Sequence, residues 1–242
     1  MANFTVEFIS RKANESIPNR DEALRYMGYR NFTPDEESEQ LIDECEKELL
    51  AVIRPVCCFG FTDIEVLSGN EIKWELGTLK SSSLASHLNG CTGAFFFAAT
   101  IGIGADRLIA KYSRIKPAKS VIIDALGSAA AESWCDTIEN RLTQKFNDHR
   151  WRFSPGYGDF SLEYQRDFMR CLDMSRKLGI TLTDSFLMTP TKSVTAIIGV
   201  CADSKGNISE TAASSCRNKC DECGNINCIY RNNAAIITQE EK

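Results

Sequence analysis

Apolar residues recur at helical spacing in two stretches near the start of the chain. Residues 19–28 begin with the capping residue Asn19 and stop at Gly28, which predicts a short helix. The sequence Thr33-Pro-Asp-Glu36 offers an N-cap, a proline at the first helical position and acids in the first turn. A longer helix is therefore expected from there to Arg54-Pro55, with an apolar face formed by Leu41, Ile42, Cys45, Leu49 and Val52.

Other stretches have the character of strands. The chain starts with an extended, β-branched segment at residues 4–9. Residues 56–67 and 71–76 read as a β-hairpin because the break Ser68-Gly-Asn70 between them supplies a turn. The unbroken apolar run at residues 93–99 suits a strand that is covered on both faces, so we expect it in the centre of the sheet.

Helical spacing returns in the middle of the chain. Ser81–Ser83 can cap a short helix to Leu88, an amphipathic helix follows Gly102 and Gly104 as far as Ile115, and Pro117 opens the longest helical pattern, at about residues 119–147. A loop at 151–159, a helix at 161–177, a break at Thr189-Pro190 and a strand at 193–199 complete the chain. This order has no regular strand–helix–strand rhythm, so it predicts an α+β protein with a partly antiparallel sheet.

Composition and charge exclude several classes of protein. With 43% apolar and 25% charged residues, the chain of 242 residues is typical of a folded protein. The charge sum of −5 argues against a protein that neutralises nucleic-acid phosphates. No apolar run approaches the ~18–20 residues that span a bilayer, which predicts no integral membrane segment. Residues 1–18 show no basic region followed by an apolar one, so we expect a cytoplasmic protein.

The sharpest spacing of chemically active residues lies near the end of the chain. Cysteines with two to four residues between them can converge on one metal ion, and either zinc or an iron–sulfur cluster fits such ligands. A thiol–disulfide pair at Cys220 and Cys223, or no role at all, are the alternatives. Residues 202–242 are accordingly expected to form a Cys-rich tail outside a domain at 1–201, with the candidate metal ligands Cys216, Cys220, Cys223 and Cys228.

The remaining cysteines and the histidines indicate packing rather than chemistry. Free cysteine is commonly buried, and the seven others lie among apolar neighbours. With His87 and His149 alone, the chain has almost no material for a histidine-based triad or metal site. Gly102-Ile-Gly104 lacks the third glycine of a phosphate-binding pattern, so a helix-start turn is the better interpretation. The seven cysteines are Cys45, Cys57, Cys58, Cys91, Cys135, Cys171 and Cys201.

The loop at residues 151–159 carries the other candidate site. Arg152 provides a fork suited to a carboxylate, Pro155 and Gly156 shape a turn whose backbone can approach a ligand, and Tyr157 presents a flat ring with a polar tip. Together they could hold a small zwitterion. An ordinary Pro-Gly turn beside a surface arginine is at least as compatible with the residues alone.

Read with its surroundings, this loop resembles the activation domain of cobalamin-dependent methionine synthase. The resemblance runs from about residue 20 to residue 201 and implies an α+β fold with a mixed, largely antiparallel twisted sheet packed with several helices, one of them long. The Cys-rich tail is similar to that of small free-standing relatives. The matching stretches are residues 25–30, Ala131-Glu132, Arg152-Phe-Ser-Pro-Gly-Tyr157, Leu182-Thr-Asp-Ser-Phe-Leu-Met-Thr-Pro190 and Lys192-Ser-Val-Thr-Ala196.

The resemblance implies a function and roles for individual residues. Domains of this family bind S-adenosylmethionine and present its methyl group to cob(II)alamin, which an electron from flavodoxin or ferredoxin helps to restore to methylcobalamin. Arg152 then corresponds to the carboxylate-binding arginine, Gly156 to the backbone of close approach, Tyr157 to the aromatic near the corrin, and Glu132 to the acid that contacts the donor's ammonium. A carboxylate beside a cationic ligand offsets the cost of desolvating that ligand.

One family feature is missing from the sequence. The chain has no Asp-x-His-x-x-Gly cobalamin-ligand motif, so the cobalamin is expected on a partner protein. The predicted function is therefore the activation component of a methyltransferase, working in trans on a methionine synthase that lacks its own activation domain. A non-catalytic adaptor on a corrinoid protein, or a reactivator of another corrinoid methyltransferase, is the alternative. For the predicted function the chain's task is positioning rather than acid–base chemistry.

Overall fold

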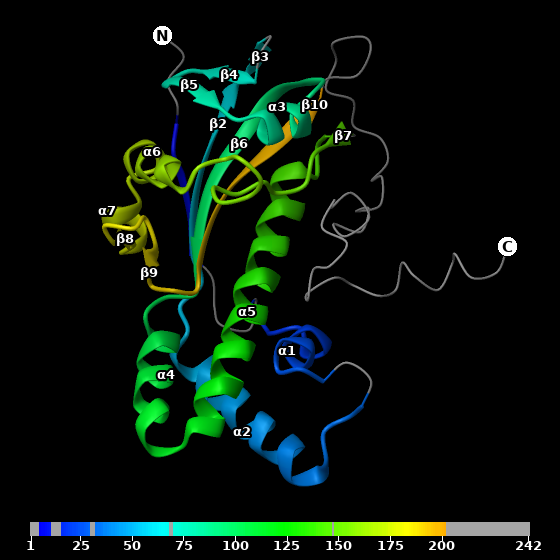
Figure 1. Cartoon of the computed structure of the whole chain (residues 1–242), viewed down its shortest axis with the longest axis vertical. Coiled ribbons are helices and arrows are strands. Elements are labelled where there is room, and N and C mark those ends of the chain that lie inside the picture. Colours follow the sequence, from blue (N-terminus) through cyan, green and yellow to red (C-terminus); the bar gives the residue numbers. More distant parts are fainter. Residues whose placement is uncertain (1–4, 11–15, 30–31, 68–69, 147, 202–242) are drawn as a thin grey trace, which may run out of the picture.

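The computed structural model describes residues 5–10, 16–29, 32–67, 70–146 and 148–201, and its centre is a five-stranded sheet. Every neighbouring pair in this sheet is antiparallel. The observed α+β architecture confirms the predicted fold class (Figure 1). In spatial order the strands are β1 (Glu7–Ser10), β2 (Val56–Asp63), β6 (Cys91–Thr100), β10 (Ser193–Cys201) and β7 (Asp148–His149).

The central strand β6 is buried on both faces, as its unbroken apolar run predicts. Because side chains alternate across a strand, Phe95 and Phe97 point into one hydrophobic core and Phe96 points into another. Phe96 is 1% exposed and stacks on Trp74 with ring centroids 4.3 Å apart. The sheet thus separates two cores rather than covering a single one.

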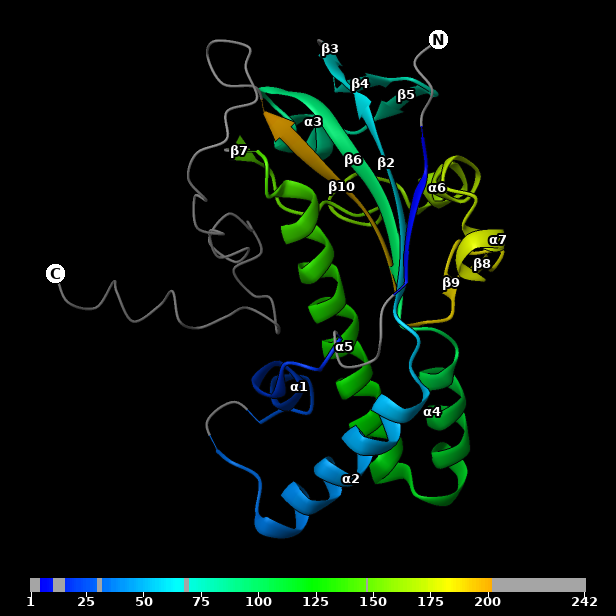
Figure 2. The same cartoon turned by 180° about the vertical axis from the view of Figure 1, so that it is seen from behind.

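Four helices accompany the first core. The long helix α5 (Pro117–Thr143) runs along this face of the sheet and continues past its end, where α1 (Arg20–Tyr26), α2 (Glu36–Val52) and α4 (Gly104–Ile115) pack around it (Figures 1 and 2). Lys119 of α5 is 2% exposed and places its Nζ 2.6 Å from Glu44 and 2.9 Å from Glu48 of α2. The Tyr112 hydroxyl also donates to Glu48, at 2.6 Å.

Smaller elements cover the second core. These are a three-stranded antiparallel sheet, a two-stranded sheet and a set of short helices (Figure 1). The short helix α3 begins after its Ser81 cap, as predicted. The elements are β3 (Glu65–Leu67), β4 (Glu71–Trp74), β5 (Gly77–Lys80), α3 (Ser82–His87), η2 (Leu162–Tyr164), α6 (Gln165–Cys171), α7 (Met174–Leu178), β8 (Thr181–Leu182) and β9 (Met188–Thr189).

The predicted hairpin pairing is present, but its predicted extent is wrong. Residues 65–67 and 71–74 do pair across the break, with Val66 opposite Ile72. Residues 56–63, however, belong to the main sheet, where β2 lies between β1 and β6. The chain leaves the main sheet at Ile64, whose backbone N–H donates to Thr92, so one apolar stretch serves two sheets. Strand β5, which the sequence analysis did not identify, completes the smaller sheet.

Two predicted helix boundaries are also wrong. Helix α2 takes Asp35 rather than Thr33 as its N-cap, because the Asp35 side chain accepts a hydrogen bond from the Ser38 backbone N–H at 2.9 Å. Helix α5 ends at Thr143 instead of continuing to residue 147.

The predicted helix at 161–177 is broken into three pieces. Its last break is at Asp173, whose φ of 51° is left-handed and cannot continue a right-handed helix. By contrast, Gly104 begins α4 as the helix-start interpretation of Gly102-Ile-Gly104 predicts. Among the described residues, no helix combines the length and the apolar character needed to cross a bilayer.

Candidate functional site

The loop after α5 runs along the outer edge of β10. Strand β7 pairs with the end of β10, and Phe153 exchanges two backbone hydrogen bonds of 2.9 Å with Ile197. Because neighbouring residues of an extended segment point to opposite faces, Phe153 enters the second core while Arg152 points toward α5. This edge pairing is what positions Arg152.

Helix α5 presents three carboxylates to that guanidinium. Glu132, Asp136 and Glu139 are spaced i, i+4 and i+7, which places them on one helix face. Arg152 Nη2 lies 2.9 Å from Glu132 Oε2, while Nη1 lies 2.8 Å from Asp136 Oδ1 and 2.7 Å from Glu139 Oε2. The structure therefore brings together Arg152 and Glu132, which were singled out separately in the sequence.

The three acids differ in burial, and this separates their roles. Glu139 is 9% exposed and also accepts a 3.2 Å hydrogen bond from the Arg152 backbone N–H. It therefore binds both the guanidinium and the backbone of Arg152. Glu132 and Asp136 are 37% and 55% exposed, whereas the Arg152 side chain is 5% exposed. Glu139 is thus the buried anchor of the loop, and the other two carboxylates reach solvent.

The cluster carries an excess of negative charge. Within these ion pairs one guanidinium faces three carboxylates, so the acids outnumber the cation by two. Burial by itself lowers the pKa of Arg152, but the carboxylates of Glu139, Asp136 and Glu132 help to raise it above its ordinary value. Arg152 therefore remains a cation within an anionic site, which is a setting that attracts a positively charged ligand.

Helix α1 adds an aromatic side chain to this site. The Tyr26 hydroxyl donates to Glu22 at 2.9 Å, and the Arg25 guanidinium lies 5.3 Å from the centroid of the Tyr26 ring. Burial and the charge of Glu22 raise the pKa of Tyr26, and the charge of Glu132 raises it further. Tyr26 therefore lies in the electrostatic field of Glu132.

The tip of the loop lies on the other side of the sheet edge. Pro155 is buried, and Gly156 has a φ of +98°, which a residue with a side chain rarely adopts. A β-carbon at Gly156 would also lie 3.2 Å from Leu162. Tyr157 is 49% exposed and packs edge-on against Phe153, with ring centroids 5.7 Å apart. The tip thus combines an accessible backbone with an accessible aromatic ring.

Asp159 fixes the end of the loop to α3. Its carboxylate accepts hydrogen bonds from the Ser81 hydroxyl at 2.5 Å and from the backbone N–H groups of Ser82 and Ser83 at 2.8 and 2.9 Å. These hydrogen bonds, of which the one from the Ser81 hydroxyl has the largest effect, hold the pKa of Asp159 well below its ordinary value. The sequence identified Ser81 as a cap but gave no sign that a second cap would come from Asp159.

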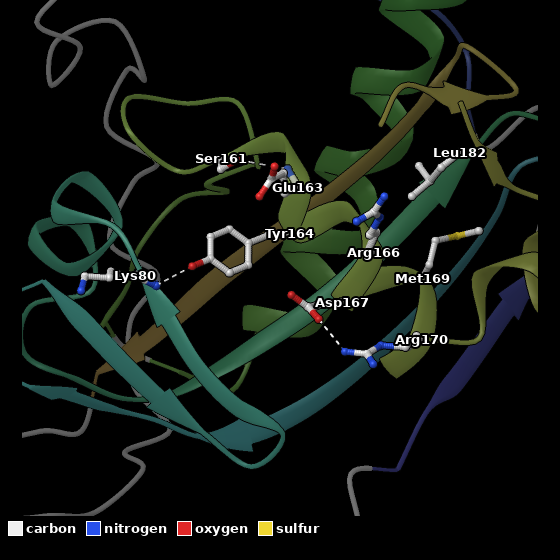
Figure 3. A pocket seen from close by; sticks show the side chains of 9 residues that line it. All are labelled: Lys80, Ser161, Glu163, Tyr164, Arg166, Asp167, Met169, Arg170 and Leu182. Atoms are coloured by element: carbon white, nitrogen blue, oxygen red, sulfur yellow. Dashed lines mark hydrogen bonds and ion pairs between the residues drawn. The ribbon is translucent and has the colours of Figure 1, made fainter. Parts of the chain in front are cut away.

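A cavity of about 810 Å³ lies next to this loop and is shown in Figure 3. Tyr164 accepts a 2.9 Å hydrogen bond there from the Lys80 backbone N–H, and Asp167 pairs with Arg170 at 2.9 Å. The lining contains both acidic and basic side chains, and some of these pair with each other. The cavity therefore shows no preference for a ligand of either charge. The lining residues are Lys80, Ser161, Glu163, Tyr164, Arg166, Asp167, Met169, Arg170 and Leu182.

The predicted metal ligands Cys216, Cys220, Cys223 and Cys228 lie outside the described residues. Within the described part of the chain, no group of three or more His, Cys, Asp or Glu side chains is arranged to hold a metal ion. His87 has a packing role, because its Nε2 lies 2.8 Å from the Trp151 carbonyl oxygen and its ring contacts that indole. Of the seven other cysteines, all but Cys171 and Cys201 are buried, as the packing interpretation expects.

A family model identifies the family of this chain, and a solved structure is similar to it in fold. Residues 85–207 match the family model described as the vitamin B12 dependent methionine synthase activation domain. A crystal structure of the MetH reactivation domain bound to AdoHcy is similar in fold, with a TM-score of 0.66 at 17% identity over 84% of this chain and 80% of that one. No curated protein sequence matches the chain. Since the family model covers half of its residues, the chain belongs to the family of vitamin B12-dependent methionine synthase activation domains.

Proposed function

We propose that this protein binds S-adenosylmethionine and, acting in trans, supports the reductive methylation of cob(II)alamin on a separate methionine synthase that lacks its own activation domain. Membership of the activation-domain family supports this role, as does a similar fold in a reactivation domain whose structure contains AdoHcy. The observation that carries the proposal is the Arg152 cluster, where a buried guanidinium meets a partly exposed Glu132 within an anionic site.

The charge of the cluster fits this ligand. S-adenosylmethionine carries an ammonium, a sulfonium and a carboxylate, so its net charge is +1, and the cluster has two excess negative charges to receive it. Glu132 pairs with the ammonium, as the family resemblance implies.

The ligand carboxylate needs a place on Arg152. Nη1 is shared by Asp136 and Glu139, and Asp136 is the more exposed of the two. Asp136 can therefore turn toward water and leave Nη1 to the ligand carboxylate, while Glu139 keeps the guanidinium in position. In this arrangement Glu139 and Asp136 are positioning residues, and Arg152 and Glu132 contact the ligand.

When bound, S-adenosylmethionine supplies an electrophilic methyl group to the reduced cobalamin of the partner protein. The chain's part is to hold and aim the donor, which requires no general acid or base. The family resemblance assigns Gly156 to the backbone of close approach and the half-exposed Tyr157 to the corrin side. Because the loop tip lies across the sheet edge from the Arg152 cluster, a donor held by Arg152 must extend around that edge to reach both residues.

The Cys-rich segment at 202–242 is proposed as a separate tail with a zinc ion or an iron–sulfur cluster on Cys216, Cys220, Cys223 and Cys228. A cluster would relay the electron from flavodoxin or ferredoxin, whereas zinc would stiffen the tail. Elemental analysis after anaerobic purification tests this proposal, and the absence of both zinc and iron would overturn it.

The donor site is tested by calorimetry with S-adenosylmethionine. We expect Glu132→Gln to weaken binding at least tenfold, because truncating the charge partner of a ligand typically costs about 2–5 kcal/mol. Lys119→Met is the matched control, since it also removes a charge interaction of α5 but leaves the Arg152 cluster intact. A wild-type chain that does not bind, or equal binding by the two variants, would contradict the site and favour the adaptor role.

The trans activity is tested by anaerobic reconstitution. The protein, a methionine synthase without an activation domain, cob(II)alamin, S-adenosylmethionine and a reductant should together restore methionine formation. Restored activity in the absence of this chain, or activity of Glu132→Gln equal to wild type, would contradict the proposal.

A further inference from the structure

Two cysteine side chains that the donor site does not use lie against each other at the end of the main sheet. Cys91 begins β6 and Cys201 ends β10, and the two residues are paired across the strands at a register shift. Their Sγ atoms are 2.9 Å apart. This separation is closer than a van der Waals contact of two sulfurs, and a covalent disulfide needs only about 2.05 Å.

The backbone around the pair leaves room for these thiols. A β-carbon at Gly199 would lie 2.7 Å from Cys91 Sγ and 2.6 Å from Leu88 Cδ2, so a residue with a side chain there would displace the Cys91 thiol. Directly opposite residues of neighbouring strands have the Cα separation that a disulfide requires. The two sulfurs can therefore be joined without moving the strands apart.

The two thiols differ in accessibility and share one cationic neighbour. Cys91 is 6% exposed, whereas Cys201 is partly exposed. Burial raises the pKa of Cys91, and the positive charge of Arg150 opposes that shift. Arg150 is kept in place by Asp148, 3.0 Å away, and by the hydrogen bond of its backbone N–H to the Gly199 carbonyl. An external reagent therefore reaches Cys201 before Cys91.

We propose that Cys91 and Cys201 form a thiol–disulfide exchange site whose substrate is a small-molecule disulfide such as oxidised glutathione. The Cys201 thiolate attacks one sulfur of the substrate, forms a mixed disulfide and releases the first thiolate. The Cys91 thiol then gives its proton to the released thiolate and attacks Cys201 Sγ, which releases the second thiolate. Two electrons pass from the cysteine pair to the substrate, and a disulfide closes between β6 and β10.

Other cysteines of the chain provide an internal comparison. Cys58 and Cys171 each direct their Sγ to a backbone carbonyl, at 3.6 Å from the oxygens of Leu172 and Phe168. Burial raises the pKa of these two thiols as it does that of Cys91, so the pKa does not distinguish the sites. Because their sulfurs are directed to carbonyl oxygens and not to a second thiol, Cys58 and Cys171 should stay reduced under conditions in which the Cys91–Cys201 pair reacts.

The exchange site is tested in the full-length chain after Cys216, Cys220, Cys223 and Cys228 are replaced by Ser, so that seven thiols remain. The protein is incubated with oxidised glutathione, quenched with acid and alkylated. We expect a product two hydrogens lighter than the reduced chain, with five alkylated cysteines and a peptide map that joins Cys91 to Cys201. The same joined peptide should appear in the wild-type chain.

Single variants separate the two steps. In the Cys91→Ser variant the reaction should stop after one glutathione has bound to Cys201. In the Cys201→Ser variant, Cys91 should react with oxidised glutathione at least tenfold more slowly than the intact pair does. Circular dichroism checks that each variant is folded, and Cys91→Ala replaces Cys91→Ser if the hydroxyl is not tolerated. Seven alkylated cysteines in the tail variant, or a disulfide between any other pair in it, would overturn the proposal. Neither result bears on S-adenosylmethionine binding.

Discussion

Two places on α5 bury a cation against carboxylates, and they differ in where the acids come from. At Lys119 the cation belongs to α5 and its acids belong to α2, so the ion pairs join two helices. At Arg152 the cation belongs to a loop and all three acids belong to α5. The Lys119 junction has two acids for one cation, with Lys111 close enough to lower the pKa of Glu48 further. The Arg152 cluster keeps two excess negative charges.

This difference shows that burial of a cation does not by itself mark a ligand site. Lys119 is as buried as Arg152, yet its charges are satisfied within the fold and it serves to hold α2 on α5. What distinguishes the Arg152 cluster is an unbalanced charge that reaches solvent through Glu132 and Asp136. The following predictions test this distinction.

The largest expected effect is on stability at the Arg152 cluster. Arg152→Ala leaves the buried Glu139 without its cation, which should lower the free energy of unfolding by about 3–5 kcal/mol. Urea denaturation at pH 7 measures this change. Adding Glu139→Gln removes the unpaired charge and should restore part of the loss. If the double variant is no more stable than Arg152→Ala, Glu139 is not the anchor described above.

A smaller loss is expected at the Lys119 junction. Lys119→Met leaves Glu44 and Glu48, which are 57% and 28% exposed and can be hydrated, so the free energy of unfolding should fall by only about 2 kcal/mol. The same denaturation experiment applies. A loss equal to that of Arg152→Ala would mean that the exposure of the acids does not separate the two sites.

Substituting a partly exposed acid of the Arg152 cluster should change S-adenosylmethionine binding without a large change in stability. Glu132→Gln and Glu44→Gln each remove one partly exposed carboxylate, so each should change the free energy of unfolding by less than about 1 kcal/mol. If the Arg152 cluster is the donor site, only Glu132→Gln should weaken S-adenosylmethionine binding. Thermal unfolding with and without the ligand reports both quantities in one experiment, and a matching loss of ligand stabilisation in Glu44→Gln would refute the distinction.

The smallest effect is a pH dependence at the Lys119 junction. The hydrogen bonds from Tyr112 and then Lys119 lower the pKa of Glu48 in the folded protein. A lowered folded-state pKa contributes stability above the unfolded carboxyl value of about 4.3, and this contribution is lost as the pH falls through the folded value. The stability difference between wild type and Glu48→Gln should therefore be constant from pH 7 to pH 5 and shrink below that range. A difference that does not change down to pH 3 would contradict this assignment.

The sequence predicts those parts of the fold that local residues determine. The caps at Asn19 and Ser81, the apolar run of β6 and the course of α5 were all identified from their own residues. The division of residues 56–67 between two sheets depends on distant partners in β1 and β6, and no local residue encodes it. The left-handed turn at Asp173 likewise lacks a glycine or proline that would have indicated the break.

The candidate site was also predictable only in part, because some of its contacts depend on tertiary structure. Arg152 and Glu132 stood out in the sequence, the second through a family resemblance. Asp136 and Glu139 were missed, although their i, i+4, i+7 spacing with Glu132 is the pattern of one helix face. That Glu139 becomes the buried anchor depends on the path of the loop along β10, which brings Arg152 back against α5. Tertiary placement, rather than residue type, selects one acid of the three.

The edge pairing of Phe153 with Ile197 limits how the length of this segment can vary in related proteins. One residue added or removed between His149 and Phe153 would exchange the two sides of the segment, so that the guanidinium would enter the aromatic core and the phenyl ring would face the carboxylates. Related chains should therefore keep the number of residues constant between these two positions, whereas insertions should be confined to the surface turns that flank them.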